Sequence, residues 1–349
     1  MAPDDFPAGG YTSDYLAFWA IWVAIVAGTW IYFRRTRGRT GRARLVAGNL
    51  LVFATLLWTA VVAGETYLRY VYDATDQWAL TLTNFSWFRR HYRANSLGFR
   101  DREFTGAKPP GTVRVGCVGD SFTMGWGVRD ANDTYPQRLG TALEAKAPGG
   151  FQVLNLGVNG TDTAAHADFV ARIAPKGGLD RVILGYCLND TDDLLPDDRR
   201  FLANSMPRVP WISPTCSFVA DFLWFRLRLR SEPRVKGYFD WELEAYQDPK
   251  IWNAQCERFR RIAETCSKSG IRLDVVVFPF FADWGENYRF GICHDRVAQA
   301  WKKLGVDAID LRDAYRGIPG SDLAVNRFDA HPNERAHAMA AQTLLDRLF

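Results

Sequence analysis

Four short polar segments of this 349-residue chain carry the residue types that acyl-transfer chemistry needs. A serine hydroxyl becomes a nucleophile when a neighbouring imidazole takes its proton, and the imidazole needs a third group that holds its orientation. We therefore predict that Ser121 is the nucleophile, that His331 is the base and that Asp329 orients the imidazole. The segments, in chain order, are Gly119-Asp120-Ser121-Phe122-Thr123, Asn155-Leu156-Gly157-Val158-Asn159-Gly160, Gly185-Tyr186-Cys187-Leu188-Asn189-Asp190 and Asp329-Ala330-His331-Pro332-Asn333.

The same segments supply hydrogen-bond donors for an oxyanion. The tetrahedral intermediate of acyl transfer carries a negative charge that preorganised donors must meet. The predicted donors are the backbone N–H groups of Ser121 and Gly157 and the side-chain amide of Asn189. Taken singly, each segment also has an ordinary structural explanation, as an N-cap turn, a turn glycine, a strand-end turn or a helix start. Their joint placement is what favours a catalytic site.

The pattern of apolar and amphipathic stretches predicts where these segments lie. Strands that alternate with helices indicate βαβ units, and therefore an α/β fold whose parallel sheet is covered by helices on both faces. Ligands bind beyond the carboxyl ends of such strands, where the first three polar segments fall. The expected strands are 112–119, 151–156, 181–187, 271–278 and 306–311, and the expected helices are 134–147, 162–174, 250–268, 292–304 and one from about 333.

In this order and spacing, the four segments resemble those of the SGNH hydrolase (GDSL-type esterase) family over roughly residues 112–349. The resemblance implies a three-layer flavodoxin-like fold. It also implies the roles of nucleophile for Ser121, oxyanion hole for Gly157 and Asn189, and remaining triad members for Asp329 and His331. The stretches NSLGFRDREF and GDSFTMGWGV resemble a bacterial membrane-anchored branch. Many members carry DxxH, whereas this chain has DxH, as do related envelope polysaccharide acetylation proteins.

Two uncharged stretches near the N-terminus, residues 15–33 and 45–64, are each long enough to cross the ~30 Å hydrocarbon layer as a helix. Six arginines lie between them, at positions 34–44. Short arginine-rich loops stay in the cytoplasm, so we expect a transmembrane hairpin in a bacterial inner membrane with the C-terminal domain in the periplasm or exterior. Two buried helices of a soluble core fit less well, because these stretches lack a polar face. A cleaved signal peptide would need basic residues before Arg34.

The predicted organisation is a hairpin at 1–64, a connector at 65–111, and the SGNH-like domain at 112–349 with an irregular insertion at about 190–248. Residues 218–229 of the insertion are dense in aromatic side chains and arginine. They fit a lid over the site, a membrane-surface helix or core packing. His337 is expected to be structural, and His91, His166 and His294 are expected at structural or surface positions.

The charge distribution argues against nucleic-acid binding. Residues 1–33 carry a charge of −3 and residues 34–44 carry +6, which leaves +1 on the rest of a chain whose net charge is +4. The sequence has no nucleotide-binding glycine motif and no metal-ligand spacing, so no cofactor or metal is expected. Disulfides fit an oxidising compartment, but no pairing is readable for the six cysteines, at 117, 187, 216, 256, 266 and 293.

The favoured hypothesis is a membrane-anchored serine O-acyl esterase or acyltransferase that acts on acyl esters, above all acetyl esters, of envelope glycans. The glycan substrate rests on the family resemblance alone. Acyl transfer would require a further membrane protein to bring acetyl groups across the bilayer. The alternative hypothesis is an SGNH-fold domain kept as a non-catalytic scaffold subunit of a membrane protein complex, against which an intact triad argues.

Overall fold

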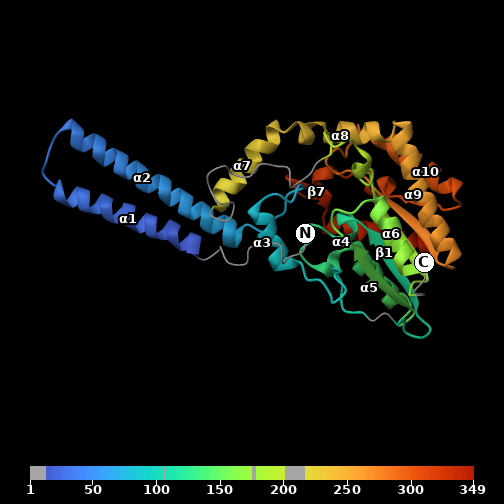
Figure 1. Cartoon of the computed structure of the whole chain (residues 1–349). Coiled ribbons are helices and arrows are strands. Elements are labelled where there is room, and N and C mark those ends of the chain that lie inside the picture. The colour runs from blue at the N-terminus through green and yellow to red at the C-terminus, as the bar shows by residue number, and fades with distance from the viewer. Residues whose placement is uncertain (1–12, 105–106, 175–177, 201–216) are drawn as a thin grey trace. The chain divides into compact units, whose positions relative to one another are not determined.

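The computed structural model describes residues 13–104, 107–174, 178–200 and 217–349, and the chain divides into two compact units (Figure 1). One, here called the helical unit, comprises Met1–Arg90 and Leu202–Ser231, and the other, the sheet unit, comprises His91–Phe201 and Glu232–Phe349. These boundaries differ from the predicted ones. The connector at 65–111 is divided between the two units, and part of the insertion at 190–248 belongs to the helical unit.

Two long apolar helices dominate the helical unit. Helix α1 spans Ser13–Arg35 and α2 spans Arg42–Thr66, and one turn of π-helix, η2, continues α2 over Tyr67–Val71. Both are long and apolar enough to be candidate membrane spans. Large apolar side chains face outward; Leu50, Phe53 and Leu56 are 63%, 63% and 65% exposed. The pair is held together by hydrogen bonds between helices, such as Trp22 Nε1 to Thr59 Oγ1 at 2.8 Å, as in helix pairs that pack within lipid.

A buried ion pair lies at the end of α2. Glu65 and Arg69 are fully and almost fully buried, and Arg69 Nε donates to Glu65 Oε2 at 2.9 Å. Glu65 also accepts from the backbone N–H groups of Phe218 and Val219, each at 3.0 Å, at the start of helix α7 (Phe218–Ser231). A carboxylate at a helix N-terminus is favourable, so Glu65 fixes α7 to α2 within the helical unit. Helix α3 (Leu82–His91) is short and begins with buried residues.

The sheet unit is built on five parallel strands in the order β2-β1-β3-β4-β5. The strands are apolar and buried on both faces, as expected for a sheet covered by helices on each side. The order is that of the flavodoxin-like fold, so the predicted fold class is confirmed. The strands are β1 Val113–Gly119, β2 Phe151–Gly157, β3 Arg181–Cys187, β4 Arg272–Phe278 and β5 Ala308–Asp310.

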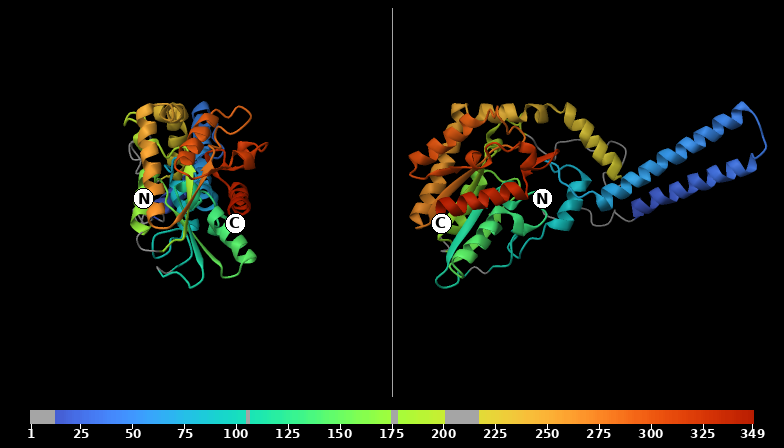
Figure 2. Two further views of the ribbon diagram at one scale, coloured as in Figure 1. Left: turned by 90° about the vertical axis from the view of Figure 1, so that its right-hand side faces the viewer. Right: turned by 180° about the vertical axis from the view of Figure 1, so that it is seen from behind.

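Helices form a layer on each face of the sheet. Helix α5 packs against β2 and against α12, while α6 packs against α9, and the left view of Figure 2 shows α9 and α12 on opposite sides of the strands. Polar N-caps start several of them; Asp162 caps α6 and Asn333 caps α12. The helices are α5 Tyr135–Lys146, α6 Thr163–Ile173, α8 Pro233–Ala245, α9 Pro249–Lys268, α10 Gly291–Lys303 and α12 Glu334–Leu348.

Several short elements complete the sheet unit at the carboxyl ends of the strands. Helix α4 (Ser121–Met124) follows β1, and α11 (Arg312–Tyr315) follows β5. An antiparallel pair, β6 (Ala324–Asn326) and β7 (Asp329–Pro332), precedes α12 and was not predicted from the sequence. The described cysteines are all free thiols, at positions 117, 187, 256, 266 and 293, and Cys216 lies outside the described residues.

One buried histidine makes the stability of the sheet unit depend on pH. His337 of α12 accepts a hydrogen bond from the Tyr135 backbone N–H at 3.1 Å and stacks on the Tyr135 ring. Burial, together with the nearby positive charges of Arg100 and Arg138, lowers the pKa of His337 from 6.5 to about 3. In the native state His337 therefore stays neutral at pH values below about 6.5, where the same histidine in the unfolded chain binds a proton.

We expect His337→Asn to reduce the acid sensitivity of the fold, because an amide oxygen can replace Nδ1 as acceptor but does not titrate in this range. For the wild type, this histidine makes the free energy of unfolding fall by up to about 1.4 kcal/mol per pH unit as the pH drops below 6.5 toward 3. Thermal unfolding of both proteins between pH 4 and 8 would measure the difference. Equal pH slopes for the two proteins would contradict it.

Candidate active site

The nucleophile turn lies directly on a row of three glycines at the carboxyl edge of the sheet. Gly119 of β1 pairs with Gly157 of β2 and Gly185 of β3. A Cβ on any of the three would lie under 3.0 Å from an atom of Thr123 or Met124. The row therefore allows α4 to approach the strand ends closely, and this places Ser121 at the first residue of α4. It lies beyond β1, beside which the order of the strands reverses.

The structure brings the three predicted triad residues together. Ser121 Oγ lies 2.9 Å from His331 Nε2, and His331 Nδ1 lies 2.5 Å from Asp329 Oδ1. With Nδ1–H donated to the carboxylate, Nε2 is left as an acceptor for the serine proton. The DxH spacing fits this geometry because Asp329 and His331 lie on strand β7, where residues two apart project from the same face.

The carboxylate of Asp329 is held in place from two directions. Its side chain is fully buried; Oδ1 accepts from the His331 backbone N–H at 3.1 Å, and Oδ2 accepts from Trp126 Nε1 at 2.9 Å. Trp126 is part of the stretch GDSFTMGWGV, and its ring also lies 5.8 Å from the His331 ring. The Trp126 indole therefore orients Asp329, and Asp329 in turn orients the imidazole of His331. Trp126 was not predicted from the sequence as a site residue.

The N–H of Gly157, the predicted oxyanion donor, is already engaged within the protein. Its N–H donates to Asn155 Oδ1 at 3.1 Å, and the residue belongs to the close-packed glycine row. The next glycine, Gly160, has a positive φ of 71° and open space around its α-carbon. Within the described part of the chain its N–H has no acceptor. The N–H of Gly160, unlike that of Gly157, is therefore available to donate a hydrogen bond to an oxyanion.

The other two predicted donors remain free to bind an oxyanion. No described residue accepts a hydrogen bond from the backbone N–H of Ser121, which opens α4, as is usual for the first turn of a helix. The side-chain amide of Asn189 makes no hydrogen bond within the described residues, and its Oδ1 is buried. Asn189 lies two residues after the end of β3, at the same edge of the sheet as Ser121.

A buried carboxyl group stands beside the nucleophile. Asp120 caps α4 by accepting from the Phe122 N–H at 2.9 Å, and its Oδ2 lies 3.5 Å from Ser121 Oγ. Burial and the charge of Asp190 raise the pKa of Asp120 to about 7. The hydrogen bond from Phe122 and the charges of His166 and His331 act in the opposite direction but are weaker. The imidazole of His331 is closer to Ser121 Oγ, at 2.9 Å against 3.5 Å for Asp120. His331 is therefore better placed to act as the base, and Asp120 holds the turn and sets the local charge beside the serine.

Residues before the first strand brace the nucleophile loop. Arg100 is fully buried and donates from Nη1 to the Gly125 carbonyl and from Nη2 to the Val128 carbonyl, each at 2.6 Å. The neighbouring Asp101 accepts from the Asn155 backbone N–H at 2.8 Å on β2. Burial lowers the pKa of Arg100 to about 10, so it stays charged at neutral pH. The stretch NSLGFRDREF is therefore part of the site's support.

The side chains around the triad show no arrangement for a metal ion. Among the residues that the structure describes, no group of three or more His, Cys, Asp and Glu side chains could hold one.

Comparison with protein families gives a match over most of the sheet unit. The model of the GDSL-like Lipase/Acylhydrolase family matches residues 117–339, which include Ser121, Asn189, Asp329 and His331. A comparison with curated proteins found no match.

Solved structures with low sequence identity also resemble the chain. TesA is 11% identical, with 67% of this chain and 96% of TesA covered and a TM-score of 0.43. The acetyl xylan esterase AlAXEase is 15% identical, with 68% of this chain and 100% of AlAXEase covered and a TM-score of 0.40. A two-domain esterase (CEX) active on acetylated mannans is 14% identical, with 67% and 48% covered and a TM-score of 0.40. Similarity of this degree says nothing about the substrate of this chain.

The hydrogen bond from Trp126 to Asp329 makes a testable contribution to the triad. Trp126→Phe keeps an aromatic ring beside His331 but removes the N–H, and a hydrogen bond to a charged group is worth about 1.5–3 kcal/mol. We expect kcat for an aryl acetate to fall by roughly ten- to a hundredfold, with little change in KM. The matched control is Trp301→Phe, because Trp301 is buried on α10 and its Nε1 has no partner among the described residues. Equal kcat values for the two variants would contradict the role of Trp126.

Proposed function

The chain belongs to the GDSL-like lipase/acylhydrolase family, and from this premise we propose that it is a membrane-anchored serine O-acyl esterase or acyltransferase. The observation that carries the proposal is the continuous contact from Asp329 through His331 to Ser121, at 2.5 Å and 2.9 Å. The side chain of His331 is 11% exposed, so the triad is largely shielded from solvent but can still be reached by a substrate. The proposed substrates are acyl esters, above all acetyl esters, of envelope glycans.

In the proposed mechanism, Ser121 Oγ attacks the ester carbonyl while His331 Nε2 takes the hydroxyl proton. The resulting oxyanion is met by the N–H of Ser121, the amide of Asn189 and, in place of Gly157, the N–H of Gly160. Collapse of this intermediate breaks the ester bond, and His331 returns its proton to the departing alcohol. Water then releases the acyl group as an acid, or a second hydroxyl group accepts it, with His331 again as base.

The helical unit supports the proposed membrane anchoring. Helices α1 and α2 are long enough to cross the hydrocarbon layer, and the short segment between them contains Arg37 and Arg39, with four more arginines in the adjoining helix ends. Such a loop favours the cytoplasmic side, which would leave the sheet unit in the periplasm or outside the cell. An enzyme on that side meets acylated glycans of the envelope. Any partner that supplies acyl groups would have to lie in the same membrane.

Ser121 should react covalently with an organophosphonate or sulfonyl fluoride probe, because both trap an activated serine. We expect Ser121→Ala to abolish labelling and aryl-acetate turnover, and His331→Ala to lower turnover to a similar extent, since nucleophile and base act as a unit. Labelling that persists in Ser121→Ala would remove this serine from the mechanism. A wild type that is neither labelled nor active would favour the non-catalytic scaffold subunit.

Reporter fusions test the proposed topology. A reporter that is active only outside the cytoplasm should be active when fused after Phe349 and silent when inserted near Gly38, because the arginine-rich loop is held inside. A reporter that is active only in the cytoplasm, placed at the same two positions, is the control and should give the opposite pattern. The reverse pattern would overturn the periplasmic placement and, with it, the envelope substrate.

A further inference from the structure

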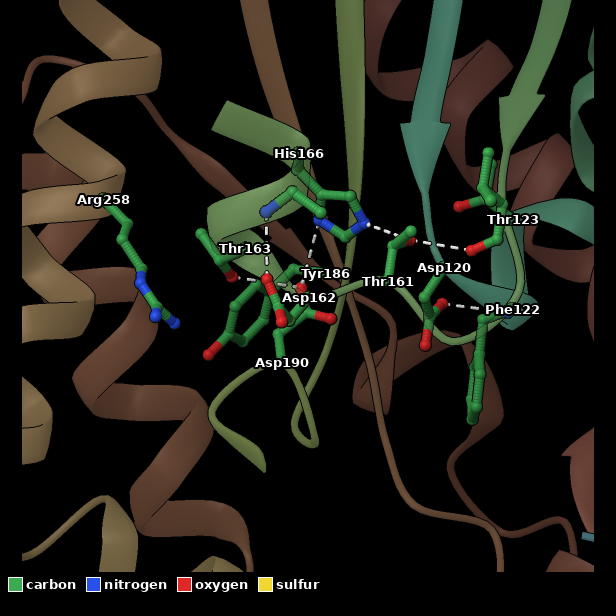
Figure 3. Close-up of polar contacts among 12 residues, drawn as sticks. Asp120, Phe122, Thr123, Thr161, Asp162, Thr163, His166, Tyr186, Asp190 and Arg258 are labelled. Carbon is green, nitrogen blue, oxygen red and sulfur yellow. Dashed lines mark hydrogen bonds and ion pairs between the residues drawn. The ribbon is translucent and has the colours of Figure 1, made fainter. Parts of the chain in front are cut away.

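A second histidine–aspartate pair lies beside the triad and is not used by the proposed mechanism. His166 of α6 and Asp190, just after β3, are 3% and 1% exposed, and Figure 3 shows them facing each other. His166 Nδ1 lies 3.5 Å from Asp190 Oδ2, and His166 Nε2 lies 3.0 Å from Thr161 Oγ1. The sequence predicts a structural or surface position for His166, and the structure buries the side chain.

The hydrogen-bond partners fix where the protons are. Thr161 Oγ1 donates its only proton to the Val158 carbonyl at 2.7 Å, so it can only accept from His166, and Nε2 must carry a hydrogen. The other ring nitrogen, Nδ1, then faces the Asp190 carboxyl group. At 3.5 Å, a proton on either His166 Nδ1 or the Asp190 carboxyl group makes this contact attractive, whereas two unprotonated groups would repel each other.

The pair connects the two loops that offer side-chain and backbone donors to the oxyanion. Thr161 follows Gly160 in the loop after β2, and Asp190 follows Asn189 in the loop after β3. Further bonds fasten each end: Val158 N–H donates to the Gly119 carbonyl at 2.9 Å, and Thr163 Oγ1 donates to Asp190 Oδ2 at 3.3 Å. A bridge from Asp190 through His166 to Thr161 therefore fixes the spacing between the loops.

We propose that His166 is a positioning residue that sets the oxyanion hole, by holding the Gly160 loop to the Asn189 loop through Thr161 and Asp190. The role rests on the proposed function, because it concerns the donors of that site. Oxyanion donors stabilise a transition state only when they are already placed where the charge develops, and misplacement by about 1 Å can cost a hundredfold in rate.

The electrostatic surroundings favour the protonated form of the bridge. Burial lowers the pKa of His166, but the carboxyl group of Asp190 beside Nδ1 and the charges of Asp120 and Asp162 outweigh burial, so the pKa is raised. In Figure 3, Arg258 of α9 lies on the opposite side of His166 and Asp190 from Asp120. Its guanidinium is paired with Asp193. The bridge is thus surrounded mainly by acidic groups that keep its proton in place.

Four variants of the full chain in mild detergent separate this role from general stability. Thr161→Val and His166→Asn each remove the contact between His166 and Thr161, because the shorter asparagine can replace Nδ1 but not Nε2. Thr161→Ser is the conservative control that keeps the hydroxyl. His166→Gln can still reach Thr161 but loses the partner of Asp190. The measurements are kcat and KM for an aryl acetate, the rate of phosphonate labelling at Ser121, and the thermal midpoint.

We expect Thr161→Val and His166→Asn to lower kcat and the labelling rate by roughly ten- to a hundredfold with KM within about twofold. Thr161→Ser should keep wild-type kcat, and His166→Gln should fall between. The double variant Thr161→Val with His166→Asn should lose no more than either single change, because both break one contact. Normalising each rate to the fraction of enzyme that the phosphonate titrates removes any effect of partial unfolding.

The outcomes distinguish this proposal from the function on which it rests. An active wild type with Thr161→Val equal to it, or with losses that multiply in the double variant, overturns the positioning role and leaves the esterase proposal standing. A wild type that neither labels nor turns over overturns the proposed function and the positioning role together. A loss of kcat that disappears after normalisation also overturns the positioning role.

Discussion

The row of glycines at the end of the sheet is the constraint on which the rest of the site depends. Gly119, Gly157 and Gly185 lie side by side on three strands, and the backbone and side chains of α4 occupy the space that their Cβ atoms would need. The nucleophile can therefore lie almost on the strand ends, within reach of loops from β2 and β3. A side chain at any of these positions would lift α4 and separate Ser121 from its partners.

Among the described residues of the sheet unit, three aspartate–histidine–hydroxyl groupings occur, which shows that this pattern alone does not make a nucleophile. Besides the triad, His166 links Asp190 to Thr161, and His294 lies 3.0 Å from Asp310 and 3.1 Å from the Tyr288 hydroxyl. Thr161 has its proton committed to a carbonyl, and Tyr288 accepts from the Phe280 N–H. Of these three described groupings, the triad is the one in which the hydroxyl residue is also the first residue of a helix, with its backbone N–H unbonded. The histidine side chain of the triad is also more exposed, at 11%, than His166 at 3% or His294 at 0%.

Much of this arrangement could be predicted from the sequence because strands and catalytic segments are local patterns. The strands, the parallel sheet and the close approach of Ser121, His331 and Asp329 all follow from runs of apolar residues and the polar segments after them. The sequence alone does not distinguish Gly157 from Gly160, because the close packing at Gly157 depends on the register of neighbouring strands and the positive φ of Gly160 depends on the path of the folded loop. Helices α3 and α8 were not predicted, and a helix at residues 218–229, where α7 lies, was one of three alternatives.

Residues that precede the first strand also support the active site. A catalytic domain counted from its first strand would begin near residue 112, yet Arg100 and Asp101 fasten both the loop after α4 and the edge strand β2. A buried guanidinium without those carbonyls, or those carbonyls without a donor, would each cost free energy, so the brace and the loop stabilise each other. The same loop carries Trp126, which binds the triad acid. The stretch NSLGFRDREF therefore acts on the chemistry through Gly125 and Trp126, and the sheet unit properly begins at His91.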